Sequence, residues 1–221
     1  MSGVMQQISI VIADDHPFYR DGLKNIISLN PSFKVVGEAS DGLELVQLVK
    51  ALQPDVIITD ISMPNKTGIE AVKKIISLKL PTKAIALTMH SEDEIILQML
   101  DAGAMGYLDK NTSKDELYQA IESVVIHDKV FFPEATRQHM YKLLTESSYK
   151  PYPNKNISFS EREIEIIKLI CLENKSKDIA EKLEISTRTV ESHRERIMER
   201  MDVRTTAGLV AYAFSHQIVS F

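Results

Sequence analysis

Short apolar runs alternate with longer amphipathic stretches through the first half of the chain. The run from Ile8 to Ala13 is rich in β-branched residues and too short for a buried helix, which predicts a central strand. Further strands are predicted at 34–39, 56–59, 84–88 and 106–108, and helices at 18–29, 43–52, 68–80, 92–102 and 114–127. Five strand–helix units in series predict a parallel five-stranded sheet covered on both faces, which is a doubly wound α/β domain.

The pattern changes after His127. The Phe-Phe-Pro run at 131–133 predicts a break, residues 134–145 predict one linker helix, and residues 151–156, with two prolines among polar residues, predict an exposed connection. Four helical stretches follow without a convincing strand, at 160–172, 176–183, 187–201 and 205–216. We therefore expect an α/β domain over residues 1–128, a linker over 129–156 and a small all-α domain over 157–221.

Composition and charge narrow the class of protein. The 221 residues are 44% hydrophobic and 26% charged, which is enough to bury a core, and the net charge is −5. Residues 1–126 carry 11 basic and 17 acidic side chains, which argues against binding of nucleic acid by bulk charge alone. The single cysteine, the lack of a long apolar run and the lack of a secretory signal lead us to expect a soluble cytoplasmic protein without disulfides or a membrane partner.

Several chemically active side chains lie at or just beyond the carboxyl ends of the predicted strands: Asp14, Asp15, Asp60, Thr88 and Lys110. Ligands of an open parallel sheet bind outside these ends, so we expect the five to converge on one rim. Neighbouring carboxylates repel each other, by roughly 4 kcal/mol for two unit charges 4 Å apart near a protein surface. A Mg²⁺ ion, which binds carboxylates together with waters and phosphate oxygens, would remove that repulsion.

The same side chains could accept a phosphoryl group. A carboxylate can attack phosphorus to form an aspartyl phosphate, while Mg²⁺, an ammonium group and a hydroxyl stabilise the phosphoryl oxygens. Asp60 is the expected nucleophile because it stands alone at the end of the middle strand, and the pair Asp14 and Asp15 is expected to hold the metal. Loop solubility would explain any one of these residues, but poorly explains all five at corresponding strand ends.

The first 125 residues or so resemble the receiver domain of two-component response regulators. The resemblance is carried by Asp14-Asp15, the Asp-Ile-Ser-Met-Pro segment at 60–64 followed by Gly68, Thr88, and the segment 102–110 that ends in Lys110. It implies a flavodoxin-like, CheY-like fold in which Asp60 is the phosphoacceptor and Lys110 pairs with the phosphoryl group. It further implies Asp15 as a direct Mg²⁺ ligand, Asp14 as a ligand through water, and the Ser62 backbone carbonyl as a third ligand.

The resemblance also implies a switch made of Thr88 and Tyr107. A phosphoryl group adds about −1.5 to −2 of charge, which would draw the Thr88 hydroxyl toward it and let Tyr107 turn inward from solvent. The face expected to change comprises the helix at 92–102, the last strand and the helix at 114–127. Asn111 follows Lys110 where many receivers have proline, which leaves the isomer of that peptide bond open.

The two helices at 176–183 and 187–201, with Ser186 as N-cap of the second, have the form of a helix-turn-helix. In the second helix Val190, Ile197 and Met201 form one apolar stripe. Cations for DNA phosphates are available at Arg188, Arg194, Arg196 and Arg200, at Arg204 just after this helix, and at His193 if it faces outward. Glu191, Ser192 and Glu195 are candidates for base readout, and Thr189 is a further candidate DNA contact. From composition alone, a solvated helix of mixed charge is an equally good interpretation.

Residues 157–221 are similar to the LuxR-type helix-turn-helix, on Phe159-Ser-Glu-Arg-Glu163 and on the segment 185–193 that ends in Ser-His. With the receiver, this resembles the NarL/FixJ class of response regulators. It implies that 187–201 is the recognition helix, that 205–216 is the dimerisation helix and that Glu163 is an internal buttress. Glu173 stands where relatives usually carry a helix-ending glycine, and we expect Asn174 to take the left-handed backbone instead.

Together these features predict a transcription factor, not an enzyme, that is phosphorylated on Asp60 by a sensor histidine kinase and binds double-stranded DNA as a homodimer. One alternative is a receiver-switched adaptor that binds protein instead of DNA, which the near-neutral charge of residues 157–221 favours. Another is a Mg²⁺-dependent phosphohydrolase with an aspartyl nucleophile. Such enzymes usually carry a second aspartate two residues after the first, where this chain has Ser62.

Overall fold

The computed structural model describes residues 7–89, 93–133, 142–143 and 157–219. Its first domain contains a five-stranded parallel sheet in the order β2-β1-β3-β4-β5. The strands are β1 (Ile8–Ala13), β2 (Phe33–Ala39), β3 (Val56–Asp60), β4 (Lys83–Thr88) and β5 (Gly106–Asp109). Every residue of β3 is buried, as expected of a central strand with helices on both faces.

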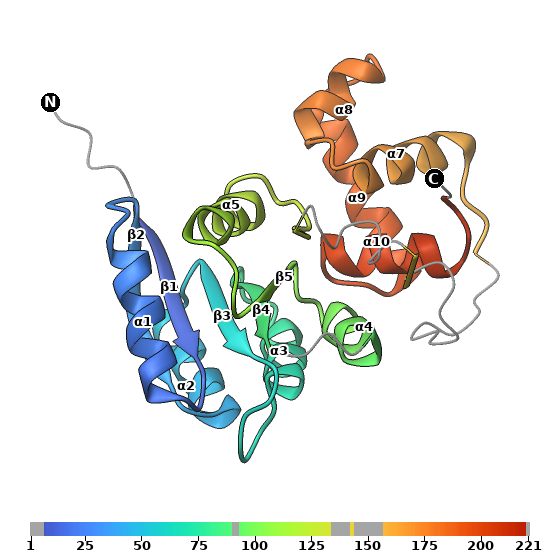
Figure 1. Cartoon of the computed structure of the whole chain (residues 1–221). Coiled ribbons are helices and arrows are strands. Elements are labelled where there is room, and N and C mark those ends of the chain that lie inside the picture. Colours follow the sequence, from blue (N-terminus) through green and yellow to red (C-terminus); the bar gives the residue numbers. More distant parts are fainter. Residues whose placement is uncertain (1–6, 90–92, 134–141, 144–156, 220–221) are drawn as a thin grey trace, which may run out of the picture.

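Helices cover both faces of this sheet, as Figure 1 shows. They are α1 (Pro17–Ser28), α2 (Gly42–Leu52), α3 (Gly68–Ser77), α4 (Asp93–Asp101) and α5 (Lys114–Val125). α1 and α5 share one face, where the Tyr118 hydroxyl donates to the Ile26 carbonyl, and α2, α3 and α4 pack in a row on the other. The predicted doubly wound architecture is confirmed.

The second domain is all-α and consists of α7 (Glu161–Cys171), α8 (Ser176–Lys182), α9 (Thr187–Met201) and α10 (Thr206–Ser215). The predicted stripe on α9 is confirmed, because Val190, Ile197 and Met201 are all buried. Nearly all of α10 is buried as well, because it packs against α7 on one side and against α4 of the receiver on the other. Within the described residues, no helix has the length and apolar character needed to cross a membrane.

The segment between the domains differs from the prediction at residues 131–133. Residues 131–133 do not simply break the chain, because Phe131 forms a parallel bridge to Gly106 and donates its backbone N–H to Met105 at 2.8 Å. The linker begins, therefore, as a short continuation of the sheet beside β5. Of the linker helix predicted at 134–145, only 142–143 are described, and they are helical. The connection predicted at 151–156 lies outside the described residues.

The end of α7 corrects the expectation for Asn174. Glu173 itself adopts the left-handed backbone, with φ of 58°, although glycine is the residue that adopts it without strain. Asn174 acts instead through its side chain, whose Nδ2 donates to the carbonyls of Leu169 and Leu172 at 2.9 and 3.3 Å. These bonds satisfy carbonyl groups that have no partner within the helix, which offsets part of the strain at Glu173.

Candidate functional site

The parallel register of the sheet brings the predicted pocket residues to one rim. Asp60 ends β3, Thr88 ends β4, and Asp14 and Lys110 directly follow β1 and β5. Ala13 pairs with Thr59, and Thr88 pairs with Asp109, so that the strands end at the same level. The convergence predicted from strand ends is found in the structure.

Lys110 joins the two innermost carboxylates. Its Nζ lies 2.5 Å from Asp14 Oδ2 and 3.0 Å from Asp60 Oδ2, and the three side chains are 7% exposed or less. The other Asp60 oxygen, Oδ1, accepts a hydrogen bond from the Ile61 backbone N–H at 2.7 Å. Asp60 is therefore held by both oxygens, with its carboxylate at the edge of the rim.

Burial and charge shift the pKa values here in a consistent way. Desolvation raises the pKa of Asp60 above its ordinary value, although Lys110 acts in the opposite direction. Burial alone would lower the pKa of Lys110, but its hydrogen bonds to Asp14 and Asp60 and their charges raise it. Lys110 thus remains a cation inside the pocket, where it offsets one of the neighbouring negative charges.

Asp15 and His16 complete the group on its open side. Asp15 is 34% exposed, and its Oδ1 lies 2.7 Å from His16 Nδ1. One donor atom each from Asp14, Asp15, His16 and Asp60 lie within 4.8 Å of one another. Carboxylate oxygens at this spacing suit a divalent cation, so the residues fit the metal that the sequence predicts. Ser62 lies in the loop that follows Asp60, and the role of its carbonyl stays a prediction.

Gly68 keeps the loop after Asp60 tight. Its backbone N–H donates to the Ile61 carbonyl at 2.9 Å, and a Cβ atom at this position would lie 2.0 Å from the Asp60 carbonyl oxygen. A side chain therefore cannot be placed here without moving the backbone of the phosphoacceptor. This close approach explains the glycine in the motif.

The switch residues lie together, but not as the sequence led us to expect. Tyr107 is already turned inward, 4% exposed, and its hydroxyl forms a hydrogen bond with Thr88, which is 6% exposed. Burial raises the pKa of Tyr107 to about 12. The expectation that Tyr107 starts in solvent is wrong for this structure. A buried ring whose hydroxyl keeps a partner is stable without a phosphoryl group. The Lys110–Asn111 peptide bond is trans.

Two residues of α1 that sequence reasoning missed also contact the pocket. The Tyr19 hydroxyl donates to the Lys110 carbonyl at 3.2 Å, and Lys110 Nζ lies 4.8 Å from the centre of the Tyr19 ring. Arg20 donates to the Asp14 carbonyl at 2.6 Å. Burial, and then the charges of Asp14 and Asp60, raise the pKa of Tyr19. The sequence did carry a signal for these two residues, namely their distance along the chain from Asp15. A helix that begins directly after Asp15 places its first turn over the rim, and Tyr19 and Arg20 lie in that turn.

The predicted DNA-contacting residues of α9 fall into two groups. Arg188, Thr189, Glu191, Glu195 and Arg196 are exposed, and Ser192 and His193 are half-buried. Arg200 is different, because its guanidinium donates to both carboxylate oxygens of Glu163 at 2.8 and 2.9 Å and lies 4.8 Å from the centre of the Phe159 ring. These contacts agree with Glu163 as an internal buttress and leave Arg200 engaged within the domain. Its contact with DNA stays a prediction.

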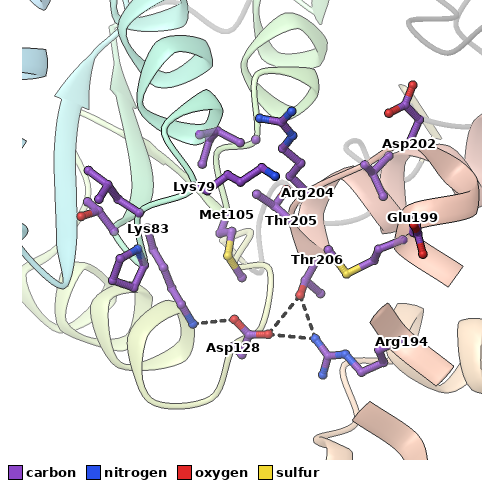
Figure 2. A pocket seen from close by; sticks show the side chains of 17 residues that line it. Lys79, Lys83, Met105, Asp128, Arg194, Glu199, Asp202, Arg204, Thr205 and Thr206 are labelled. Carbon is purple, nitrogen blue, oxygen red and sulfur yellow. Dashed lines mark hydrogen bonds and ion pairs between the residues drawn. The ribbon is translucent and has the colours of Figure 1, made fainter. Parts of the chain in front are cut away.

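Arg194 does not face solvent in this arrangement, contrary to the phosphate contact predicted for it. It is 14% exposed and donates to Ser176 at 3.0 Å, to Thr206 at 2.9 Å and to Asp128 at 2.8 Å. Figure 2 shows Asp128, from the end of the receiver, between Lys83 of the receiver and Arg194 and Thr206 of the helical domain. These contacts join the two domains directly.

Among the cavities that border this junction are two that residues of both domains line. One of about 580 Å³ is lined by Lys79, Lys83 and Met105 of the receiver and by Arg204 and Thr205 of the helical domain (Figure 2). The second, of about 460 Å³, is lined by Ile126 and His127 together with Glu191 and Glu195 of α9. The end of the receiver thus lies beside two residues predicted to read bases.

Comparison with known proteins matches both domains to known families. Residues 10–122 match the response regulator receiver domain, and residues 157–213 match the bacterial regulatory proteins of the luxR family. The chain belongs to the response regulators that carry a receiver domain and a LuxR-type DNA-binding domain. This membership favours DNA binding over the adaptor interpretation.

Relatives and solved structures share this organisation. The oxygen regulatory protein NreC of Staphylococcus carnosus is 35% identical over 97% of this chain and 100% of its own length. The transcriptional regulatory protein YxjL of Bacillus subtilis is 32% identical over 96% of this chain and 98% of its own. The structure of the response regulator RcsB–DNA complex has a TM-score of 0.58 and 27% identity, and covers 95% of this chain and 99% of its own.

Proposed function

We propose that this response regulator is a transcription factor switched by phosphorylation of Asp60 by a sensor histidine kinase. The observation that carries the proposal is the position of Lys110 Nζ between Asp14 and Asp60 at the rim of the sheet. A carboxylate at a strand end, held by a buried ammonium and flanked by two further acids, suits transfer of a phosphoryl group. The pocket takes one phosphoryl group per signalling event and serves as a switch, not as an enzyme.

In the transfer, an oxygen of Asp60 forms a bond to phosphorus while the bond between phosphorus and the kinase histidine breaks. Asp15, Asp60 and the Ser62 carbonyl, with Asp14 through water, would hold Mg²⁺, which would neutralise charge on the phosphoryl group. Lys110 moves from the Asp60 carboxylate to a phosphoryl oxygen, and its contact with Asp14 keeps it within reach. The Thr88 hydroxyl, at the end of the neighbouring strand, stabilises a further phosphoryl oxygen.

The phosphoryl group then changes how the domains dock. Thr88 already forms a hydrogen bond with Tyr107, so that a movement of Thr88 toward the phosphoryl group alters the contacts of that ring. In the docked arrangement α10 packs against α4, and Asp128 holds Arg194. We infer that release of these contacts frees α10 to form a homodimer and moves the end of the receiver away from Glu191 and Glu195 of α9. A near-neutral single domain would bind DNA weakly, so the dimer is needed.

The test combines labelling with selection of DNA. The chain and its Asp60→Asn variant are incubated with Mg²⁺ and a small-molecule phosphodonor, and intact mass is measured. We expect one phosphoryl group on the parent chain and none on the variant; stoichiometric labelling of the variant at another residue would reject Asp60 as acceptor. DNA is then selected from a random pool with and without phosphodonor. Enrichment that increases with phosphodonor and weakens with salt is expected, and a binding constant independent of salt would contradict this mode of binding.

A further inference from the structure

Tyr19 lies in the first turn of α1, and its side chain holds Lys110 at two points. The hydroxyl donates to the Lys110 carbonyl at 3.2 Å, and Lys110 Nζ lies 4.8 Å from the centre of the ring. The same Nζ contacts Asp14 Oδ2 and Asp60 Oδ2. The ammonium that is expected to move onto a phosphoryl oxygen therefore has two carboxylates and one aromatic ring as its neighbours.

The packing of α1 fixes the backbone of Tyr19 relative to the rim. Leu23 and Ile27, on later turns of the helix, are buried in the core. Arg20, the next residue, donates to the Asp14 carbonyl at 2.6 Å and so joins the first turn of α1 to the end of β1. The ring of Tyr19 thus projects from a turn that is attached to the strand end on which the pocket is built.

A ring in this place affects what the ammonium can do. The face of an aromatic ring attracts a cation, and the attraction is stronger where water is excluded; the Lys110 side chain is only 5% exposed. Exclusion of water also strengthens the attraction between the ammonium and a nearby anion. Because a lysine side chain is flexible, holding it near its final position before transfer removes part of the entropic cost of the transition state.

A cavity of about 160 Å³ adjoins the contact between ring and ammonium. Tyr19 and Lys110 both line it, together with Leu23, Leu87 and Leu117 among others. A smaller side chain at position 19 would enlarge this cavity next to Lys110 and let water reach the ammonium. The ring itself, and not only the hydrogen bond of its hydroxyl, is therefore the part of Tyr19 that matters most.

We propose that Tyr19 is a positioning residue for phosphoryl transfer, which acts through Lys110. The proposal rests on the phosphoacceptor role proposed for Asp60 and adds a residue that sets the rate of that transfer. A tyrosine that only packs α1 against the end of β5 would affect labelling whether or not residue 110 carries an ammonium. A positioning residue would lose its effect together with the ammonium that it positions.

The test is the initial rate at which acetyl phosphate labels the full chain at Asp60 in Mg²⁺, measured by intact mass. Tyr19→Leu should lower this rate about 5- to 30-fold, which is the contribution of a cation–π contact shielded from water. Tyr19→Phe keeps the ring and should stay within about threefold of the parent, because it loses only one long hydrogen bond. In a Lys110→Met chain, adding Tyr19→Leu should lower the residual rate by less than about twofold, since the two residues act as a unit.

Tyr118→Leu is the matched control. This tyrosine of α5 is also half-buried and also binds α1, through a hydrogen bond to the Ile26 carbonyl near the other end of that helix. Its loss should leave the labelling rate within about twofold of the parent. An unchanged rate in Tyr19→Leu, an equal loss in Tyr118→Leu, or an undiminished loss in the Lys110→Met chain would overturn the proposal. Thermal unfolding of each variant checks that it is folded at the assay temperature.

Reductive methylation of Lys110, measured by peptide mass, separates this proposal from the phosphoacceptor assignment because it needs no phosphorylation. It should be faster in Tyr19→Leu than in the parent, where the ring shields the ammonium, and unchanged in Tyr118→Leu. If the parent is not labelled at Asp60 while methylation depends on Tyr19, the proposed function fails and the hold of Tyr19 on Lys110 stands. If Asp60 is labelled while neither rate depends on Tyr19, only the role of Tyr19 fails.

Discussion

The contact between Asp128 and Arg194 gives a direct way to test whether docking of the two domains restrains DNA binding. Asp128→Asn keeps the shape of the side chain but removes the charge that pairs with Lys83 and Arg194. The side-chain oxygen of the asparagine can still accept a hydrogen bond from the Thr206 hydroxyl. The substitution therefore removes only the ionic contribution to the contact. Phosphorylation of Asp60 should proceed as in the parent chain.

The size of the effect follows from burial. A hydrogen bond to a charged group contributes about 1.5–3 kcal/mol, and because Asp128 is 45% exposed we reduce the total for its two ion pairs to about 1–2 kcal/mol. At about 1.4 kcal/mol per factor of ten, the ratio of docked to undocked chains should fall roughly 5- to 30-fold. The apparent affinity of the unphosphorylated chain for DNA rises by at most this factor, since it scales with the fraction that is undocked.

The assay pairs a distance with an affinity. Labels at Lys50 in α2 and Glu181 in α8, both exposed, report the separation of the domains, and the selected DNA reports binding. Asp21→Asn, which removes an exposed carboxylate on α1, is the matched control. If Asp128→Asn leaves the distance and the affinity where the control leaves them, the contact does not restrain the domains and the argument from Figure 2 is refuted.

Three further substitutions test particular contacts. Lys110→Met should leave a folded chain whose labelling by phosphodonor falls at least tenfold, measured as the initial rate, because one stabilised phosphoryl oxygen is typically worth about that much or more. Burial alone would raise the pKa of Glu163, but hydrogen bonds from Ser160 and Arg200 outweigh it and lower that pKa, so Glu163→Gln should remove stability that is present above the ordinary carboxyl pKa; the difference in unfolding free energy between parent and variant should shrink as the pH falls through the lowered pKa. Glu173→Gly should raise the unfolding free energy of the helical domain by about 0.5–1 kcal/mol, measured by thermal unfolding, because glycine adopts the left-handed backbone without strain. A loss of stability in this variant would show that the strain at Glu173 is negligible.

The pocket could be predicted because the positions of its residues follow from the local sequence pattern, which shows where strands end, and from the parallel topology of the sheet. Asp14, Asp60 and Thr88 stand where apolar strand runs end, and parallel strands bring such ends together whatever the loops between them do. The same logic places Lys110 at the rim. For Tyr19, the spacing after Asp15 places the first turn of α1 near the rim, but the hydrogen bond to Lys110 depends in addition on how α1 packs over it.

The misplaced residues are those whose surroundings come from the other domain or from the linker. On α9 alone, Arg194 is one arginine among several, and only the docking of the receiver gives it Asp128 as a partner. The resemblance implied that Tyr107 starts in solvent, whereas in this structure the ring is buried and Phe131 runs beside its strand. Glu173 was misplaced for a different reason. The preference of non-glycine residues against the left-handed backbone is only about 1–2 kcal/mol, which is small beside the packing free energy of a whole helix.

The docked arrangement also connects the pocket to the recognition helix through few contacts. Thr88 forms a hydrogen bond with Tyr107, and the Tyr107 backbone N–H donates to the Phe131 carbonyl at 3.2 Å. Asp128, three residues before Phe131, holds Arg194 in α9. A phosphoryl group that draws Thr88 away breaks the hydrogen bond between Thr88 and the Tyr107 hydroxyl. Because β5 is hydrogen-bonded to Phe131, a shift of β5 also moves the segment that positions Asp128. If this order of events is correct, the pocket of Asp128→Asn is still phosphorylated, but phosphorylation changes the affinity of the helical domain for DNA less than it does in the parent chain.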